Sequence, residues 1–180
     1  MFTNELIKKA HENAVAHGFW DSAPTFSESC ALIHSEISES FEEWRNNRPN
    51  EYTGENGKPE GVWVELADVV LRVADLLGYI ETMISTKDDT FTKLYGDVLE
   101  AMRNIKGSFG EFIDYLHMLV AEASKENDAD SDDGTVFTFV YLLMNVYAKA
   151  EVDGIDLDGI VERKHAYNVT RPYRHGNKRL

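Results

Sequence analysis

The sequence predicts an all-α protein, and the simplest architecture is a helical bundle. Apolar residues recur with helical periodicity through nearly all of the chain, and no segment alternates apolar and polar residues as a half-buried strand does. Proline occurs only 4 times in 180 residues, so few helices would be interrupted. With 43% apolar residues, the chain suits one compact domain or at most two small subdomains. The expected helices are residues 3–17, 26–46, 61–83, 88–104, 108–126, 134–152 and 156–168.

Local signals explain several of these boundaries. Thr25 with Glu28 three residues later forms a capping-box pattern at the start of helix 26–46. The stretch NNRPNEYTGENGKPEG (46–61) is rich in proline, glycine and asparagine, which predicts a loop. The stretch KENDADSDDG (125–134) predicts an acidic, turn-rich linker.

Composition restricts the class of protein. The formal net charge is −14, which argues against a nucleic-acid partner bound through a general basic face. No apolar run approaches the roughly 20 residues needed to cross a bilayer, and the charged N-terminal stretch does not resemble a signal peptide. A single cysteine, Cys30, excludes an internal disulfide. We therefore expect a cytoplasmic protein with no membrane partner.

Helix 26–46 carries two carboxylates on an inner boundary. On a helical wheel its apolar stripe comprises Phe26, Cys30, Ile33, Ile37, Phe41 and Trp44. Glu36 and Glu39 share the face beside that stripe, whereas Glu42 and Arg45 lie on the far side.

Helix 61–83 is apolar nearly all round, which predicts that it is buried. Its polar residues occupy one sector of about 80° and are Glu65, Asp68, Arg72 and Asp75. Such a sector on a buried helix would point into the bundle. The two helices would then bring Glu36, Glu39, Glu65 and Asp68 together as a four-acid cluster.

The chemistry of this cluster favours a hard cation. Four partly buried carboxylates repel one another and lose hydration, so protonation or a bound cation must offset the repulsion. Oxygen ligands without histidine or cysteine suit Mg²⁺, with Mn²⁺ as an alternative, and do not suit zinc. A di-iron bundle would need Glu-x-x-His pairs, which these helices lack.

Several motifs in this order resemble a known family. Glu36-x-x-Glu39 followed by Glu65-x-x-Asp68 resembles the ExxE…ExxD signature of the MazG-like all-α nucleoside triphosphate pyrophosphohydrolases. The similarity covers about residues 17–80 and 153–178 and includes HGFW, ALIHSEISESFEEWR, KPEGVWVELADVVLRVADLLG and GIDLDGIVERKHAYNVTRPYRHGNK.

The resemblance implies a catalytic core and its activity. It implies Mg²⁺-dependent hydrolysis of nucleoside or deoxynucleoside triphosphates to the monophosphate and pyrophosphate, for house-cleaning or control of the nucleotide pool. Glu36, Glu39, Glu65 and Asp68 would be the catalytic metal ligands, and one of them, Glu39, would also orient or deprotonate the attacking water. The alternative is a catalytically inactive helical module that binds a nucleotide or a protein.

The C-terminal region supplies the expected substrate-binding residues. The resemblance implies that Lys164 and Asn168, four residues apart on one helical face, bind substrate. Arg171 and Arg174 follow near Pro172 and would reach phosphate oxygens, since a guanidinium binds phosphate through two hydrogen bonds. Simple solvation of a basic tail is the alternative for Arg174, and also for His175.

Other residues admit both a structural and a functional interpretation. Trp20 and Trp44 would either sandwich a base or belong to the core. Arg72 with Asp75 is expected to be a buried structural pair, with Asp75 as an alternative support for the metal ligands.

Residues 84–152 depart from the family pattern. We interpret them as an inserted helical subdomain within a catalytic core formed by residues 1–83 and 153–180. The helices of this insertion overlay residues 26–77, so that His117 corresponds to His34, whereas Leu119, Thr138 and Tyr141 replace Glu36, Glu65 and Asp68. The insertion is then a degenerate repeat that completes the bundle as a partner subunit would, and the alternative is a coincidence between two amphipathic helix pairs. A homodimer remains the expected assembly.

Overall fold

The computed structural model describes residues 2–80, 89–105, 107–128 and 132–177, and these fold as a mainly helical protein. The elements are α1 (Asn4–Ala16), α2 (Phe26–Arg45), β1 (Tyr52–Thr53), η1 (Glu55–Gly57), β2 (Pro59–Glu60), α3 (Val62–Tyr79), α4 (Asp89–Asn104), α5 (Phe109–Asp128), α6 (Asp132–Asp153), α7 (Leu157–Val169) and α8 (Arg174–Asn177). The all-α prediction is confirmed. Among the described residues, no helix is both long enough and apolar enough to cross a membrane.

Each expected helix is present and begins within two residues of its predicted start. The Thr25–Glu28 capping box is confirmed, since each side chain bonds the backbone N–H of the other residue. Helix α3 ends at Tyr79, earlier than the predicted 83. The described part of the predicted acidic linker (125–134) instead belongs to α5 and α6, and residues 129–131 lie outside the described residues.

The predicted loop 46–61 contains a short element that sequence periodicity missed. Strands β1 and β2 pair antiparallel across the 3₁₀ turn η1, with Tyr52 opposite Glu60. Two-residue strands are too short to show an alternating pattern. This hairpin packs against α3 and α7.

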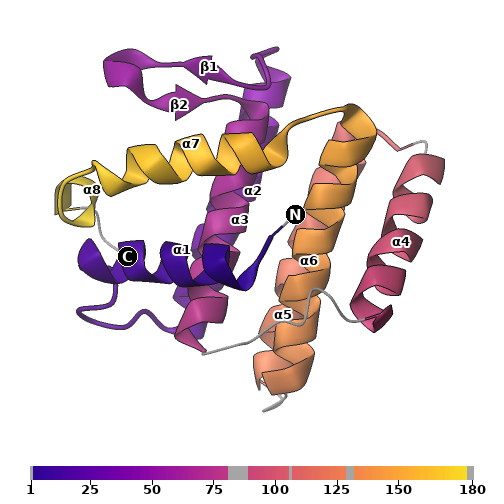
Figure 1. Cartoon of the computed structure of the whole chain (residues 1–180), viewed down its shortest axis with the longest axis horizontal. Helices are drawn as coiled ribbons and strands as arrows, with labels where there is room; N and C mark the ends of the chain where they lie inside the picture. Colours follow the sequence, from indigo (N-terminus) through magenta and orange to yellow (C-terminus); the bar gives the residue numbers. More distant parts are fainter. Residues whose placement is uncertain (1, 81–88, 106, 129–131, 178–180) are drawn as a thin grey trace.

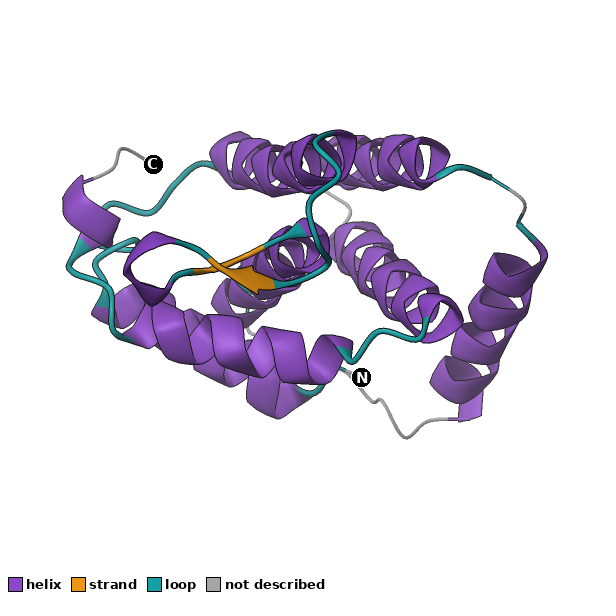
Figure 2. Ribbon diagram, turned by 90° about the horizontal axis from the view of Figure 1, so that it is seen from above, coloured by secondary structure: helices purple, strands orange, loops and turns teal. Residues whose placement is uncertain are grey.

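Helix α3 is the central element of the structure. It contacts α1, α2, α6 and α7, while α5 and α6 pair with each other and α4 packs on α6 (Figure 1). Its apolar residues are nearly all buried, as predicted for a helix that is apolar all round. Figure 2 shows the same arrangement from above. The polar sector of α3 is thereby enclosed between α1, α2 and α7.

Trp44 is a correction to the predicted core stripe. Its side chain is 44% exposed, although it stacks on Phe41 with ring centroids 5.5 Å apart. It lies in the last turn of α2, where packing against Phe109 covers only part of the indole.

Three features are compatible with the interpretation of α5–α6 as a repeat of α2–α3. Ser108 and Glu111 form a capping box like that of Thr25 and Glu28. His34 and His117, which the overlay equates, meet at the α2–α5 interface with Nδ1 atoms 2.8 Å apart and rings stacked at 23°. The helix pairs α2–α3 and α5–α6 also share one apolar core. The repeat nevertheless stays a prediction, because two unrelated amphipathic helix pairs can pack in this way.

The histidine pair predicts a pH dependence of stability. Burial lowers the pKa of both His34 and His117 from the ordinary 6.5. The unfolded chain therefore binds more protons, and the stabilisation present above pH 6.5 is lost as the pH falls through the folded-state pKa values. We expect His117→Gln to flatten the fall in the free energy of unfolding between about pH 7.5 and about pH 5, measured by urea denaturation.

The neighbouring Met118→Gln provides the matched control. Met118 lies on the same helix with a 61% exposed side chain, so this variant should keep the wild-type slope. Equal slopes for His117→Gln and wild type would contradict the assignment of this dependence to the histidine pair.

Candidate metal and phosphate site

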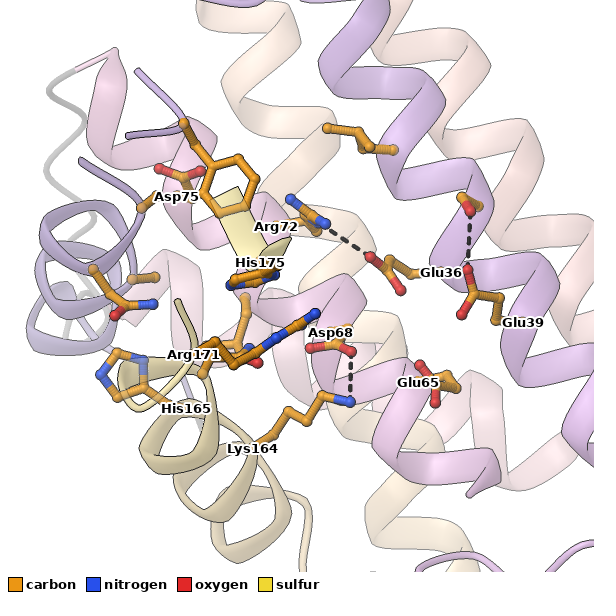
Figure 3. Close-up of a pocket in the computed structure, with 18 of the residues that line it drawn as sticks. Glu36, Glu39, Glu65, Asp68, Arg72, Asp75, Lys164, His165, Arg171 and His175 are labelled. Carbon is orange, nitrogen blue, oxygen red and sulfur yellow. Dashed lines mark hydrogen bonds and ion pairs between the residues drawn. The ribbon is translucent and has the colours of Figure 1, made fainter. Parts of the chain in front are cut away.

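A cavity of about 220 Å³ opens where α1, α2, α3 and α7 converge (Figure 3). Five carboxylates line it, together with four side chains that are always basic: two lysines and two arginines. The cavity lies over the polar sector of α3. Most of the predicted site residues therefore line this one cavity.

Three carboxylates form the centre of the site. Glu36 on α2 and Glu65 and Asp68 on α3 each present an oxygen, and these oxygens lie within 4.8 Å of one another. Glu36 is 9% exposed and Glu65 is 5% exposed, so neither is a solvated surface acid. The i,i+3 spacing places Glu65 and Asp68 on one face of α3, and α2 brings Glu36 against it. We call these residues the carboxylate triad.

Glu39 is the fourth expected member of the cluster, and it lies apart from the triad. It lines the same cavity, but its side chain is exposed and accepts a hydrogen bond from Ser35 Oγ at 3.1 Å. Figure 3 shows its carboxylate on the outer side of Glu36. The structure thus brings three of the four predicted acids together and places Glu39 at the edge.

Two basic side chains neutralise the triad. Arg72 donates from Nε to Glu36 Oε1 at 3.1 Å, and Lys164 Nζ lies 2.8 Å from Asp68 Oδ2. Lys164 is only 1% exposed and also donates to the carbonyl of Pro59 in β2 at 3.3 Å. The hairpin and α7 together therefore fix this lysine against α3.

The electrostatics of the triad show the strain of burying like charges. Burial raises the pKa of Glu65 to about 7, and Asp68 and Glu36 add to this rise while Lys164 opposes it. Burial also raises the pKa of Glu36, reinforced by Asp68 and opposed by Arg72. For Lys164, burial alone would lower the pKa, but Asp68 and Glu65 raise it above its ordinary value.

Asn168 and Arg171 complete the wall contributed by α7 and the segment after it. Asn168 lines the cavity one turn after Lys164, and its buried Oδ1 has no hydrogen-bond partner among the described residues. Arg171 also lines the cavity, and burial lowers the pKa of its guanidinium. No carboxylate of the described residues forms an ion pair with it.

Arg174 does not line this cavity. Its guanidinium donates to the Gly18 carbonyl at 3.0 Å and to Ser22 Oγ at 3.3 Å, and its backbone N–H bonds the His17 carbonyl. The structure therefore does not place Arg174 beside the other expected substrate-binding residues. Arg174 attaches the C-terminal segment to the loop after α1.

Other contacts strengthen that attachment. His17 Nε2 lies 3.0 Å from the Arg171 carbonyl, so it holds the backbone of a cavity residue. Tyr173 packs directly on Gly18, which has φ +75°, and a Cβ there would collide with the tyrosine ring.

Arg72 and Asp75 do not form the expected pair. Arg72 binds Glu36, whereas Asp75 Oδ1 binds His11 Nδ1 at 2.8 Å and accepts from Trp20 Nε1 at 2.9 Å. Trp20 stacks on Tyr79 with centroids 4.1 Å apart and does not face Trp44, so no two-tryptophan sandwich forms.

Sequence reasoning missed several lining residues. Phe19, His165 and His175 line the cavity, and Phe19 packs edge-on against His175 with centroids 4.9 Å apart. Lys58 also reaches the cavity from the hairpin. The position of His165, directly after the predicted residue Lys164, could have indicated it. Phe19 and Lys58 lie in loops, where helical periodicity gives no signal.

The donor set of the triad fits a hard divalent cation. It offers only carboxylate oxygens, and their close approach despite burial is what a shared cation would stabilise. Mg²⁺ and Mn²⁺ match such donors better than zinc does. Comparisons with known proteins add no assignment: no protein-family model, curated protein or solved structure matches the chain.

Removal of one triad charge should stabilise the protein. Because the folded-state pKa of Glu65 is raised from 4.5 to about 7, stability is lost as the pH rises through this range. We expect Glu65→Gln to raise the free energy of unfolding at about pH 8 by on the order of 2 kcal/mol, measured by urea denaturation in chelator.

Added Mg²⁺ should reduce this difference in stability between the two proteins. A cation that binds only the folded state stabilises it, so Mg²⁺ should raise the melting temperature of wild type more than that of Glu65→Gln. Destabilisation by Glu65→Gln at about pH 8 would contradict the repulsion argued for the triad.

Proposed function

We propose that this protein is a Mg²⁺-dependent hydrolase that converts nucleoside or deoxynucleoside triphosphates to the monophosphate and pyrophosphate. The observation that carries the proposal is that the carboxylate triad lines one cavity together with basic and amide side chains. Acids on one wall suit metal ions, and Lys164 and Arg171 on the other suit phosphate oxygens. The resemblance to the MazG-like family supports the choice of reaction.

Each side chain has a role in this scheme. Glu36, Glu65 and Asp68 hold Mg²⁺, which when bound neutralises charge on the phosphates and polarises them toward attack. Glu39 lies beside the triad with an exposed carboxylate, where it orients the attacking water and accepts its proton.

The opposite wall positions the substrate. Arg171 binds phosphate oxygens, while Lys164 supports Asp68 and adds positive charge near the reacting phosphate. Asn168 donates and accepts hydrogen bonds toward the nucleoside, using the Oδ1 that is otherwise unpaired among the described residues. A cytoplasmic homodimer that removes unwanted nucleotides or controls their pool remains part of this proposal.

A second candidate function is nucleotide binding without turnover. One observation favours it: Arg72 and Lys164 already pair with two members of the triad, so much of its charge is balanced without a metal. Turnover distinguishes the two functions directly.

The decisive experiment incubates the purified protein with Mg²⁺ and a panel of NTPs and dNTPs. We expect pyrophosphate and monophosphate in equal amounts, and loss of all activity in chelator. Asp68→Asn and Glu39→Gln should each lower kcat by about 10²-fold or more, because one removes a metal ligand and the other the proton acceptor.

Glu42→Gln is the matched control. Glu42 lies on the outer face of α2, where it binds exposed Arg45, so its removal should leave kcat unchanged. Release of single phosphate would contradict the proposed reaction, and tight nucleotide binding without turnover under any divalent metal would favour the second function.

A further inference from the structure

Arg72 differs from Lys164 in how firmly it is held. Lys164 is enclosed and has two oxygen partners, whereas the Arg72 side chain is 27% exposed. Among the described residues, Arg72 forms one side-chain hydrogen bond, from Nε to Glu36. Its terminal nitrogens, which carry four of its five donor hydrogens, therefore remain available on the side of the cavity.

The Arg72–Glu36 bond conflicts with metal binding by the triad. A guanidinium 3.1 Å from Glu36 Oε1 occupies the carboxylate that a divalent cation would use. Two positive groups at this distance repel strongly in a partly buried site. A cation can bind all three carboxylates only if the guanidinium moves away or shares Glu36 at an energetic cost.

Among the described residues, Arg72 forms an ion pair with Glu36 and with no second carboxylate. Asp75 is nearby, but its Oδ1 already binds His11 and Trp20. Phe19 lies beneath the guanidinium, with its ring centroid 5.9 Å from Cζ, and can support the group without pairing with it. Arg171 is a second positively charged side chain that lines the same cavity. An anion bound between Arg72 and Arg171 would be attracted to both guanidinium groups.

We propose that Arg72 exchanges partners: it neutralises Glu36 in the free protein, and it binds a phosphate oxygen of the substrate once a divalent cation occupies Glu36. The inference rests on the proposed function, and it names a phosphate-binding residue that the sequence did not reveal. A guanidinium suits this exchange because its planar fork binds carboxylate and phosphate in the same geometry.

The exchange couples the metal to the polyphosphate. The metal releases Arg72 from Glu36, and the anion then holds the released guanidinium, so each ligand favours binding of the other. This coupling adds to the direct attraction between metal and phosphate. It predicts that Arg72 weakens binding of the metal alone and strengthens binding of the anion when metal is present.

The test measures binding and not turnover. Titration of Mn²⁺ alone, followed by electron paramagnetic resonance, should show roughly tenfold tighter binding to Arg72→Gln than to wild type, because a repelling charge is removed. At saturating Mn²⁺, a non-hydrolysable α,β-imido nucleoside triphosphate should bind Arg72→Gln about tenfold more weakly, because a charge-assisted hydrogen bond is lost.

Two further variants make the result specific. Arg103→Gln removes the same charge from an exposed pair between Arg103 on α4 and Glu151 on α6, so both affinities should stay at wild-type values. Arg72→Lys keeps the charge without the fork, so Mn²⁺ affinity should stay near wild type while analogue affinity falls. Thermal melting followed by circular dichroism establishes that each variant is folded. If Arg72→Gln does not fold, Arg72→Lys by itself still tests the proposal.

The outcomes separate this inference from the proposed function. Unchanged or weaker Mn²⁺ binding by Arg72→Gln would overturn the exchange and leave Arg72 as a structural partner of Glu36. Absence of Mn²⁺ binding in the wild type overturns both ideas. The expected binding pattern without any hydrolysis would support the exchange while rejecting the catalytic proposal.

Discussion

The central constraint on the site is that the fold holds three carboxylates together although they repel one another. Glu36, Glu65 and Asp68 lie within reach of one ion, and burial raises the pKa of both glutamates. The apolar surface of α3 supplies the packing that keeps these acids in place against their repulsion. Arg72 and Lys164 reduce the electrostatic cost without removing it. Additional positive charge would relieve the remaining repulsion, and the metal-dependent hydrolase proposed above would use this property.

The beginning and end of the chain together close this site. Lys164 is carried by α7, which packs on α3, and the segment after α7 is attached to the loop after α1. His17 binds the carbonyl of Arg171, and Gly18 leaves room for the ring of Tyr173. The basic wall of the cavity is therefore positioned by contacts between residues separated by about 150 positions in sequence.

The sequence predicts the helices and the acids well because both depend on short-range periodicity. The spacing of Glu65 and Asp68 on an apolar helix fixes their common face wherever that helix packs. The partners of Arg72 and Asp75 could not be predicted in this way, since each bonds a residue on another element. Glu39 shows what helical periodicity cannot predict within one helix. Its position on the helical wheel is close to that of Glu36, yet its side chain is exposed to solvent whereas Glu36 is buried. The loop residues that line the cavity are brought there by tertiary contacts alone.

The α5–α6 pair supports one of the two helices that carry the triad. Helix α5 packs on α2, so α2 contacts both α3 and α5. In the overlay, Leu119, Thr138 and Tyr141 stand where α2 and α3 carry the triad, and this set has no carboxylate to hold the same ion. Without acids at these positions, the second pair avoids a second cluster of repelling charges, which would weaken the bundle. The α5–α6 pair thus contributes packing against α2, whose Glu36 meets Glu65 and Asp68 of α3.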